Sequence, residues 1–266
     1  MSKEEKRSLG DRMKKNYENR NQYSIPRRTY TIIRLDGKAF HSFTRHIQAV
    51  KPFDHNLMTR MDLTAKFLCY NIQGCQLAYI QSDEISLLLT DFSSIDTHAW
   101  YDGNIQKMAS VSSSLATGFF NSIPSGHFGD KVYSHIDKFK GHDVNDWVLE
   151  ADRELAYFDS RAFCIPDKIE VYNYLVWRIK DWETNSLSMV ARKFYTQGQL
   201  EGKDKSELFS MIKSQGEDWT ELPSYYRKGR FCSKAMGGMW NIHDVPEISD
   251  PEEKRKFIDM IPSIGY

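Results

Sequence analysis

The sequence has few of the features that mark a secreted, membrane-bound or zinc-stabilised protein. It has only four cysteines, Cys69, Cys75, Cys164 and Cys232, and none of them form a C-x-x-C pair. Neither a zinc site nor a disulfide framework is therefore indicated, and we expect buried or neutral thiols. No apolar run approaches the length of a transmembrane helix, and the N-terminal residues MSKEEKRS have no signal-peptide core. We expect a cytoplasmic protein with no membrane partner.

The chain also lacks an excess of charge of either sign. Lys and Arg together number 36, as do Asp and Glu, so the net charge is zero. This balance argues against a protein that coats nucleic acid without specificity. Residues 1–28 are an exception, with nine basic and four acidic side chains and a net charge of +5. We predict a basic arm, helical over residues 3–20, that either contacts phosphates or is simply solvated.

A carboxylate lies within residues 30–43, YTIIRLDGKAFHSF, directly after an apolar run. The β-branched and apolar run before Asp36 predicts a buried strand that carries this carboxylate at its C-terminal end. Gly37 allows the backbone to turn sharply and to approach a ligand closely. Asp and a backbone carbonyl together are ligands for a hard cation.

A second acidic turn lies in residues 76–90, QLAYIQSDEISLLLT, where apolar runs flank Ser82 and Asp83. This pattern predicts a β-hairpin with an acidic tip. If the hairpin lies beside the first strand, Asp36 and Asp83 meet at one edge of the sheet and suit Mg²⁺, which keeps few protein ligands. The alternative is an ordinary Asp-Gly turn and a solvated hairpin tip.

Helical periodicity indicates how this sheet is covered. Residues 53–72 place Leu57, Met61, Thr64, Leu68 and Ile72 on one face, and a second helix starting near residue 103 does the same with Ile105, Met108, Val111, Leu115 and Phe119. A strand follows over residues 156–163, then helices over 169–180, 186–194 and 205–214. The order predicts an α/β (α+β) fold with a ferredoxin-like antiparallel sheet, helices on one face and a mixed C-terminal extension.

Several short motifs occur in order between about residue 30 and residue 234. They are R-L-D-G-K-A-F-H at 34–41, K-P at 51–52, Q-S-D-E-I-S at 81–86, F-D-S-R at 158–161, Y-L-V-W-R at 174–178, E-L-P at 221–223 and Y-R-K-G at 226–229. In these motifs the chain resembles the tRNA-His guanylyltransferase superfamily, enzymes that extend RNA in the 3′-to-5′ direction. The resemblance implies a polymerase-palm core over residues 29–165, after the basic arm of residues 1–28 and before a helical and mixed region of residues 166–266.

The resemblance also implies roles for individual residues. Asp36 and Asp83 would be catalytic and, with Gly37, would bind two Mg²⁺ ions. The implied nucleotide-binding residues are Asp36, Gly37, Lys38, Ala39, Phe40, His41, Lys51, Ser82, Asp83 and Lys107, although Gly103 and Asn104 replace basic residues that often precede the last of these in the family. The implied RNA-binding residues are Arg161, Arg178, Asn185, Arg227 and Lys228. A homo-oligomer, a tetramer, is expected by resemblance only.

The implied reaction is the addition of nucleotides to the 5′ end of tRNA. The RNA end is activated as a triphosphate or by adenylylation from ATP, and the 3′-hydroxyl of GTP or another nucleoside triphosphate attacks it. The tRNA-His branch carries an H-I-N-N-L-Y-N motif, where this chain has E-T-N-S-L-S-M at residues 183–189. An acid in place of the His would repel an RNA backbone. The sequence therefore favours the branch that repairs 5′-truncated tRNA by Watson–Crick templating.

Other functions are compatible with parts of this pattern. The first alternative is tRNA-His guanylyltransferase proper, which adds a single 5′ G. A palm-type nucleotide cyclase also uses a strand Asp and an acidic hairpin tip, but bacterial cyclases of that kind have a Gly-Gly pair where this chain has Gln81 and Ser82. A catalytically inactive tRNA-binding protein is a further alternative, and the presence of Asp36, Asp83 and Lys51 argues against it.

Overall fold

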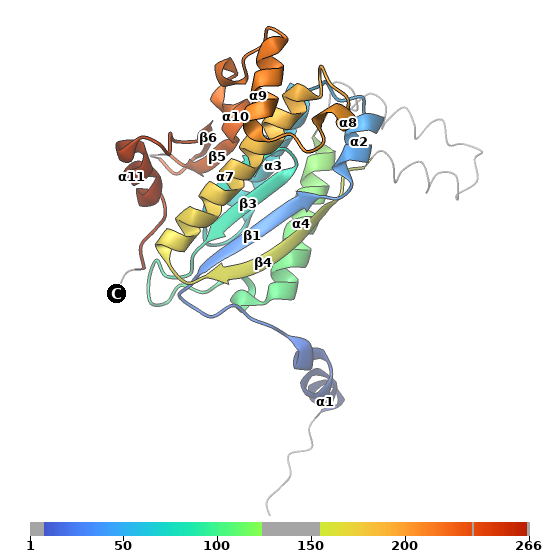
Figure 1. The fold of residues 1–266 in the computed structure, drawn as a ribbon. Helices are drawn as coiled ribbons and strands as arrows, with labels where there is room; N and C mark the ends of the chain where they lie inside the picture. Colours follow the sequence, from blue (N-terminus) through green and yellow to red (C-terminus); the bar gives the residue numbers. More distant parts are fainter. Residues whose placement is uncertain (1–7, 124–154, 236, 265–266) are drawn as a thin grey trace, which may run out of the picture.

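The computed structural model describes residues 8–123, 155–235 and 237–264. Figure 1 shows a central sheet with helices on both sides, and α1 extending away from it. The described elements are α1 (Leu9–Asn16), η1 (Glu18–Asn21), β1 (Tyr30–Gly37), α2 (Phe40–His46), α3 (His55–Asn71), β2 (Cys75–Gln81), β3 (Glu84–Leu89), η2 (Trp100–Gly103), α4 (Ile105–Ser122), β4 (Phe158–Ile165), α7 (Lys168–Ala191), α8 (Gln197–Leu200), α9 (Lys205–Ser214), η3 (Trp219–Glu221), α10 (Ser224–Lys228), β5 (Arg230–Lys234), β6 (Trp240–Asp244) and α11 (Pro251–Asp259). None of these helices is both long and apolar enough to cross a membrane.

The sheet has six strands in the order β4-β1-β3-β2-β5-β6, and every neighbouring pair is antiparallel. The first four strands, with α3 and α4 between them, have the ferredoxin-like arrangement predicted from the sequence. The C-terminal region does more than pack on this core, because β5 and β6 add two strands beside β2. Residues 123–142, whose lack of a clear periodicity predicts a connecting loop or lid, lie, apart from Ile123, outside the described residues.

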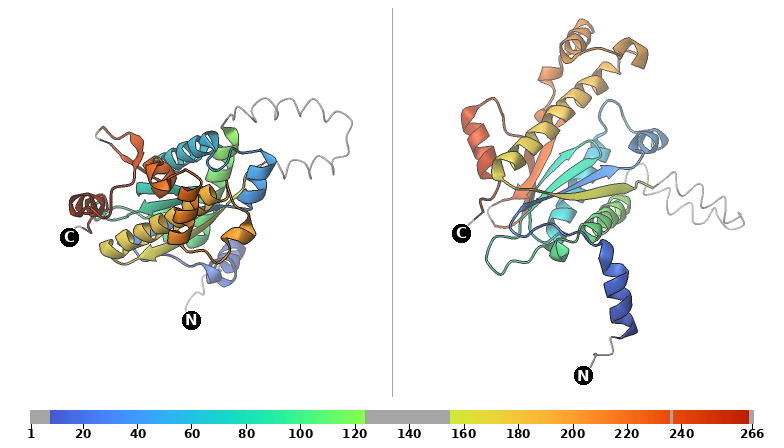
Figure 2. Two further views of the ribbon diagram at one scale, coloured as in Figure 1. Left: turned by 45° about the horizontal axis from the view of Figure 1, so that its top comes forward. Right: turned by 60° about the horizontal axis from the view of Figure 1, so that its bottom comes forward.

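The two faces of the sheet are covered by different helices (Figure 2). Side chains of β1 alternate between the faces, as in any strand. Ile33 and Leu35 join the hydrophobic cluster formed with α3 and α4, and Tyr30 and Ile32 join the cluster formed with α7 and α11. The prediction of helices on one face is correct for α3 and α4, and α7 covers the opposite face.

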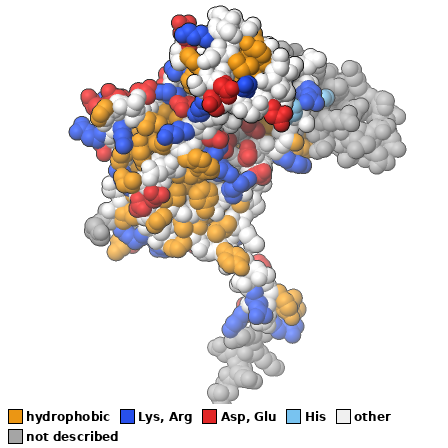
Figure 3. Space-filling model, in the orientation of Figure 1, with side chains coloured by type: hydrophobic (Ala, Val, Ile, Leu, Met, Phe, Trp, Pro, Cys, Tyr) orange, Lys and Arg blue, Asp and Glu red, His pale blue; other side chains and the backbone are white. Residues whose placement is uncertain are grey.

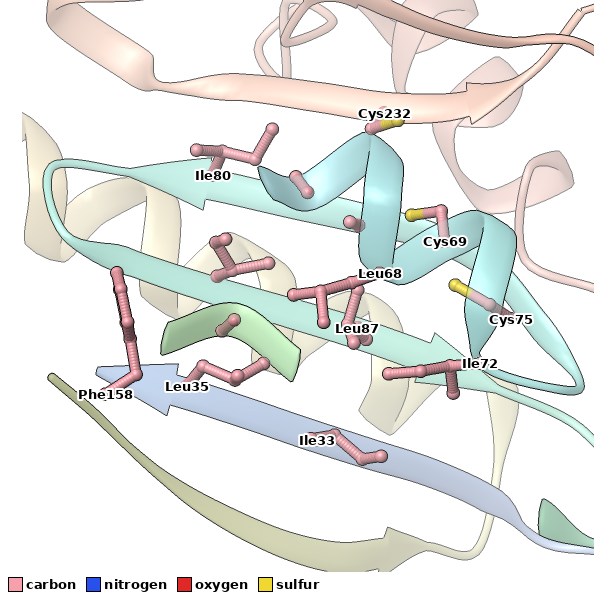
Figure 4. Close-up of a cluster of buried hydrophobic side chains, with 14 of the residues drawn as sticks. Ile33, Leu35, Leu68, Cys69, Ile72, Cys75, Ile80, Leu87, Phe158 and Cys232 are labelled. Atoms are coloured by element: carbon pink, nitrogen blue, oxygen red, sulfur yellow. The ribbon is translucent and has the colours of Figure 1, made fainter. Parts of the chain in front are cut away.

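The core beneath α3 contains three of the four thiols (Figure 4). Cys69, Cys75 and Cys232 are buried there among the aliphatic side chains of β1, β2 and β3, whereas Cys164 is exposed on β4. Free Cys packs as a small hydrophobe in such surroundings. Contact with the Cys232 and Cys75 thiols, and then burial, raise the pKa of Cys69 far above its usual range, so the expectation of neutral buried thiols is correct for this group.

Three details of the helices differ from the sequence prediction. The two helices predicted over residues 169–180 and 186–194 are one continuous helix, α7, because the polar residues between them form its exposed side rather than a break. In α4 Met108 is buried as predicted, but the other buried positions are Ser112, Ala116 and Phe120, each one residue after a predicted one. The spacing of Tyr174 and Trp177 predicts that both pack in the core, but Trp177 is 53% exposed.

A buried ion pair ties α7 to the sheet. The Arg178 guanidinium donates from Nε to Glu84 Oε1 at 2.8 Å and from Nη2 to Glu84 Oε2 at 2.7 Å. Both side chains are about 9% exposed. Next to this pair, the Tyr174 and Ser86 hydroxyls are hydrogen-bonded at 2.8 Å. Bidentate geometry of this kind is among the stronger charge-assisted interactions, so it sets where α7 crosses β3.

We expect Arg178→Met to lower the free energy of unfolding by about 3–5 kcal/mol, because it leaves the Glu84 carboxylate buried without its partner. The double variant Arg178→Met/Glu84→Leu should recover much of this loss, since no buried charge remains. Urea unfolding followed by circular dichroism measures both values. The control is Lys203→Met, which removes an exposed ion pair with Glu207 and should leave the free energy of unfolding almost unchanged, because solvent screens such pairs. Equal effects for Arg178→Met and the control would contradict the assignment.

Candidate active site

Two carboxylates meet at one end of the sheet. Asp36 is the second-last residue of β1, and Asp83 lies in the two-residue turn between β2 and β3. The register of β1 against β3 pairs Asp36 with Glu84, and the Gly37 amide donates to the Asp83 carbonyl at 3.1 Å. The neighbouring strands therefore bring Asp36 and Asp83 together, although 47 positions separate them in the chain.

The turn that carries Asp83 is conformationally unusual. Ser82 has a φ of +43°, in the left-handed region that residues other than Gly seldom adopt. Such positions cost free energy and are common at functional sites. Burial, together with the charge of Asp36, raises the pKa of Asp83 to about 6, against a lowering contribution from a hydrogen bond to Ser82. The ionised form of Asp83 is thus disfavoured, and a nearby cation would stabilise it.

The segment after β1 places backbone rather than side chains at the site. A Cβ atom on residue 37 would lie 2.2 Å from the Phe40 ring, so only glycine fits there. The Phe40 ring itself is buried. Its centroid lies 5.8 Å from that of the Phe120 ring and 5.4 Å from that of the Phe158 ring. The sequence associated Phe40 with a nucleotide, and the structure leaves only its backbone for that role. Ala39, at the N-terminal end of α2, has a φ of +52°.

The basic side chains predicted near the nucleotide are exposed. Lys38 lies over the Tyr157 ring, 5.6 Å from its centroid, and His41 Nε2 lies 2.7 Å from Arg45 Nη2. Lys51 is also exposed. These side chains are therefore accessible to a ligand. Lys107, in contrast, lies in the first turn of α4 over the Tyr101 ring, on the helix layer opposite α7, and does not line the site.

The segment that carries Lys51 is held by residues that the sequence analysis did not single out. Asp54 accepts hydrogen bonds from the Val50 amide at 2.8 Å and from the Leu57 amide at 2.9 Å, so it closes this turn and caps α3. Phe53 stacks on Tyr226, with ring centroids 4.5 Å apart. Asp54 could have been recognised as a helix N-cap; nothing local in the sequence indicates the Phe53 contact.

A pocket of about 390 Å³ opens between the acidic end of the sheet and α7. Its lining residues are Asp36, Gln81, Ser82, Asp83, Glu84, Arg178, Asp181, Trp182, Asn185, Ser188, Met189 and Arg192. The α7 residues among them recur every three or four positions and therefore lie on one side of the helix. In Figure 3, hydrophobic side chains gather on the lower part of the face, and acidic and basic side chains gather above them, toward the C-terminal end of β1.

The residues predicted to bind RNA are dispersed. Asn185 lines the pocket, and Arg161 is exposed on β4, 3.5 Å from Asp159 Oδ1. Arg178 is buried against Glu84. Lys228 is paired with Glu247 and its side chain is 11% exposed, while Arg227 donates to the Leu222 carbonyl at 2.7 Å. Arg178 and Lys228 are thus engaged within the protein, and Asn185 and Arg161 are accessible.

The donor set at the acidic edge fits a hard divalent cation. The described residues contain no cluster of three or more His, Cys, Asp or Glu side chains arranged for a metal. The edge instead offers the carboxylates of Asp36 and Asp83 and the carbonyl of Gly37. Mg²⁺ accepts such a sparse set of oxygens because it takes its remaining ligands from water and substrate phosphates. A structural zinc site would need four ligands.

The chain is similar in sequence to proteins of one family. A family model described as tRNAHis guanylyltransferase matches residues 10–166. The tRNA(His) guanylyltransferase of Kluyveromyces lactis is 27% identical over 237 residues, which cover 84% of this chain and 89% of that protein. The probable tRNA(His) guanylyltransferase of Drosophila melanogaster is 28% identical over 222 residues, covering 77% of this chain and 67% of that protein.

Solved structures extend the similarity to the whole chain. A bacterial tRNA(His) guanylyltransferase (Thg1)-like protein in complex with ATP has a TM-score of 0.78 and 33% identity, covering 97% of this chain and all of that one. The Saccharomyces cerevisiae tRNA(His) guanylyltransferase, at 22% identity, has the same fold with a TM-score of 0.63, covering 91% of this chain and all of that one. This chain belongs to the tRNA-His guanylyltransferase family and is a nucleotidyltransferase.

Proposed function

We propose that this enzyme is a Mg²⁺-dependent nucleotidyltransferase that adds guanylate to the 5′ end of tRNA-His. The observation that carries the proposal is the convergence of Asp36 and Asp83 at the open end of the sheet, beside a pocket lined by polar side chains. The names of the curated relatives support the guanylate reaction. These names support guanylate addition rather than the templated repair reaction that the sequence predicted.

The chemistry follows from what these residues can hold. Asp36, Asp83 and the Gly37 carbonyl would bind Mg²⁺, which neutralises phosphate charge and lowers the pKa of an attacking hydroxyl. The backbone amides of residues 39–41, with the Lys38 and Lys51 ammonium groups, would hold a triphosphate. The Lys38 amide itself donates to the Tyr157 carbonyl at 2.8 Å. The 3′-oxygen of the incoming nucleotide then forms a bond to the α-phosphorus of the activated RNA 5′ end, and pyrophosphate or AMP leaves.

A second candidate is the templated repair of 5′-truncated tRNA. It is favoured by residues 183–189, where E-T-N-S-L-S-M replaces the family's H-I-N-N-L-Y-N. Asn185, Ser188 and Met189 from this segment line the pocket beside Asp83. The departure from the family motif therefore lies next to the carboxylates, where it can affect which nucleotide is accepted. A complex of the bacterial Thg1-like relative with GTP is compatible with either reaction.

Asp36→Asn and Asp83→Asn should each abolish nucleotide addition, because each removes a metal ligand without removing core volume. In EDTA at pH 8, Asp83→Asn should raise the midpoint temperature of unfolding. The pKa of Asp83 is higher in the folded state than in the unfolded state, so the ionised carboxylate destabilises the fold above that pKa. Incorporation of labelled GTP and thermal unfolding measure the two effects. The matched control is Asp159→Asn, the register neighbour of Asp36 on β4, which is exposed and lies outside the pocket. Activity retained by Asp83→Asn would refute the site.

Two series of tRNA substrates should separate the candidate reactions. In the first, 5′-truncated transcripts differ only in the anticodon, and in the second they differ only in the nucleotide opposite the missing 5′ residue. We expect G addition that depends on the His anticodon and not on the opposing nucleotide. If the added nucleotide instead follows the opposing base and ignores the anticodon, the repair reaction is correct. Absence of incorporation on every transcript, with Asp83→Asn as the blank, would refute both.

A further inference from the structure

The pocket has two chemically different walls. The sheet wall presents carboxylates that can only accept hydrogen bonds or bind cations, namely Asp36 and Asp83. The opposite wall, formed by α7 and the residue after it, presents the hydrogen-bond donors of Trp182 and Arg192. The Asp181 carboxylate on this wall accepts from Arg178 Nη2 at 3.1 Å. Glu84 adds no free charge to the sheet wall, because Arg178 neutralises it. A ligand that fills this pocket therefore meets metal-binding oxygens on one side and donors on the other.

Arg192 differs from the cations around it. It follows the last residue of α7, its side chain is exposed, and within the described part of the chain no acidic group pairs with it. The adjacent Lys193 is paired with Glu217 and does not line the pocket. The two neighbouring basic residues thus have different roles. The charge of Lys193 is paired within the protein, and the charge of Arg192 is available to an anion.

Trp182 adds a second, independent indication of a ligand. Its side chain is only 4% exposed, yet its indole Nε1–H has no hydrogen-bond partner in the structure. A buried donor without a partner costs free energy, and most such groups find one. The ring packs edge-on against Phe53, 6.4 Å between centroids, which holds it in place on the pocket wall.

We propose that Arg192 and the Trp182 indole N–H form a subsite for a phosphate and its attached ribose, opposite Asp36 and Asp83. The proposal rests on the proposed nucleotidyl-transfer function and adds a binding group to it. A phosphate suits the guanidinium, which forms paired hydrogen bonds to such groups. The indole N–H can donate to a ribose or phosphate oxygen. This subsite is additional to Lys38 and Lys51, neither of which lines the pocket.

The same chemistry could come from a nucleoside triphosphate or from the 5′-terminal nucleotide of the RNA. Equilibrium binding distinguishes them without requiring catalysis. One arm measures the affinity for a non-hydrolysable GTP analogue, and the other compares one tRNA transcript bearing either a 5′-phosphate or a 5′-hydroxyl. Each arm uses the wild type, Arg192→Ala, Arg192→Lys, Trp182→Phe and Lys193→Ala, the last being the neighbouring cation as a matched control.

We expect Arg192→Ala to weaken binding by about tenfold to a hundredfold, because it removes a charge-assisted contact, and Arg192→Lys to recover part of it. Trp182→Phe keeps an aromatic ring but removes the Nε1–H donor, and should weaken binding by about twofold to tenfold. If the triphosphate is the ligand, Arg192→Ala loses affinity for the GTP analogue. If the RNA end is the ligand, Arg192→Ala removes the preference for the 5′-phosphate transcript. Lys193→Ala should bind as the wild type in both arms.

The result that would overturn the subsite is an Arg192→Ala effect no larger than that of Lys193→Ala in both arms. With normal wild-type nucleotide addition, that result would refute the subsite and leave the proposed function intact. Conversely, a protein that adds no nucleotide to any transcript but loses affinity in Arg192→Ala would retain the subsite and refute the proposed function. A wild type that binds neither probe would refute both.

Discussion

The buried pair between Arg178 and Glu84 is the interaction on which the arrangement of the site depends. Glu84 directly follows Asp83 in the chain, and Arg178 lies in the middle of α7. Two charges removed from water must remain paired, because separating them leaves an uncompensated buried charge. The helix therefore cannot move along the sheet without disturbing the hairpin tip. Its second half is held over the acidic edge, and the pocket is the space between them.

The acidic edge itself is held by main-chain pairing rather than by side-chain contacts. β1 and β3 share a register that brings Asp36 and Asp83 to the same end of the sheet, and the amide after Asp36 bonds to the carbonyl of Asp83. Both carboxylates are fixed in place although burial and, to a smaller extent, repulsion by the Asp36 charge raise the pKa of Asp83. The fold tolerates this unfavourable electrostatic energy because rigid strands hold the groups, and a bound cation would offset it.

The C-terminal region contributes to the site as much as the palm does. It extends the sheet with β5 and β6, supplies one wall of the pocket from α7, and supports the segment carrying Lys51 through the stacking of Phe53 on Tyr226. Residues 183–189, in which the chain departs from the family motif, belong to this wall. A change of sequence there alters the surroundings of the carboxylates directly, because Asn185, Ser188 and Met189 line the same pocket.

The sequence by itself determined the ferredoxin-like order, the helix that covers β1 to β3, the two acidic turns and the family, because each depends on local periodicity or on short motifs. It did not determine that α7 is one helix, that Trp177 is exposed, or that Phe40 is buried. It also could not show that Arg178 and Lys228 are used in ion pairs while Arg192 is not. Arg178 and Glu84 lie 94 positions apart in the chain. Only tertiary packing decides which charges meet. The sequence gives the type of a charged residue, but not whether its side chain is paired within the protein or accessible to a ligand.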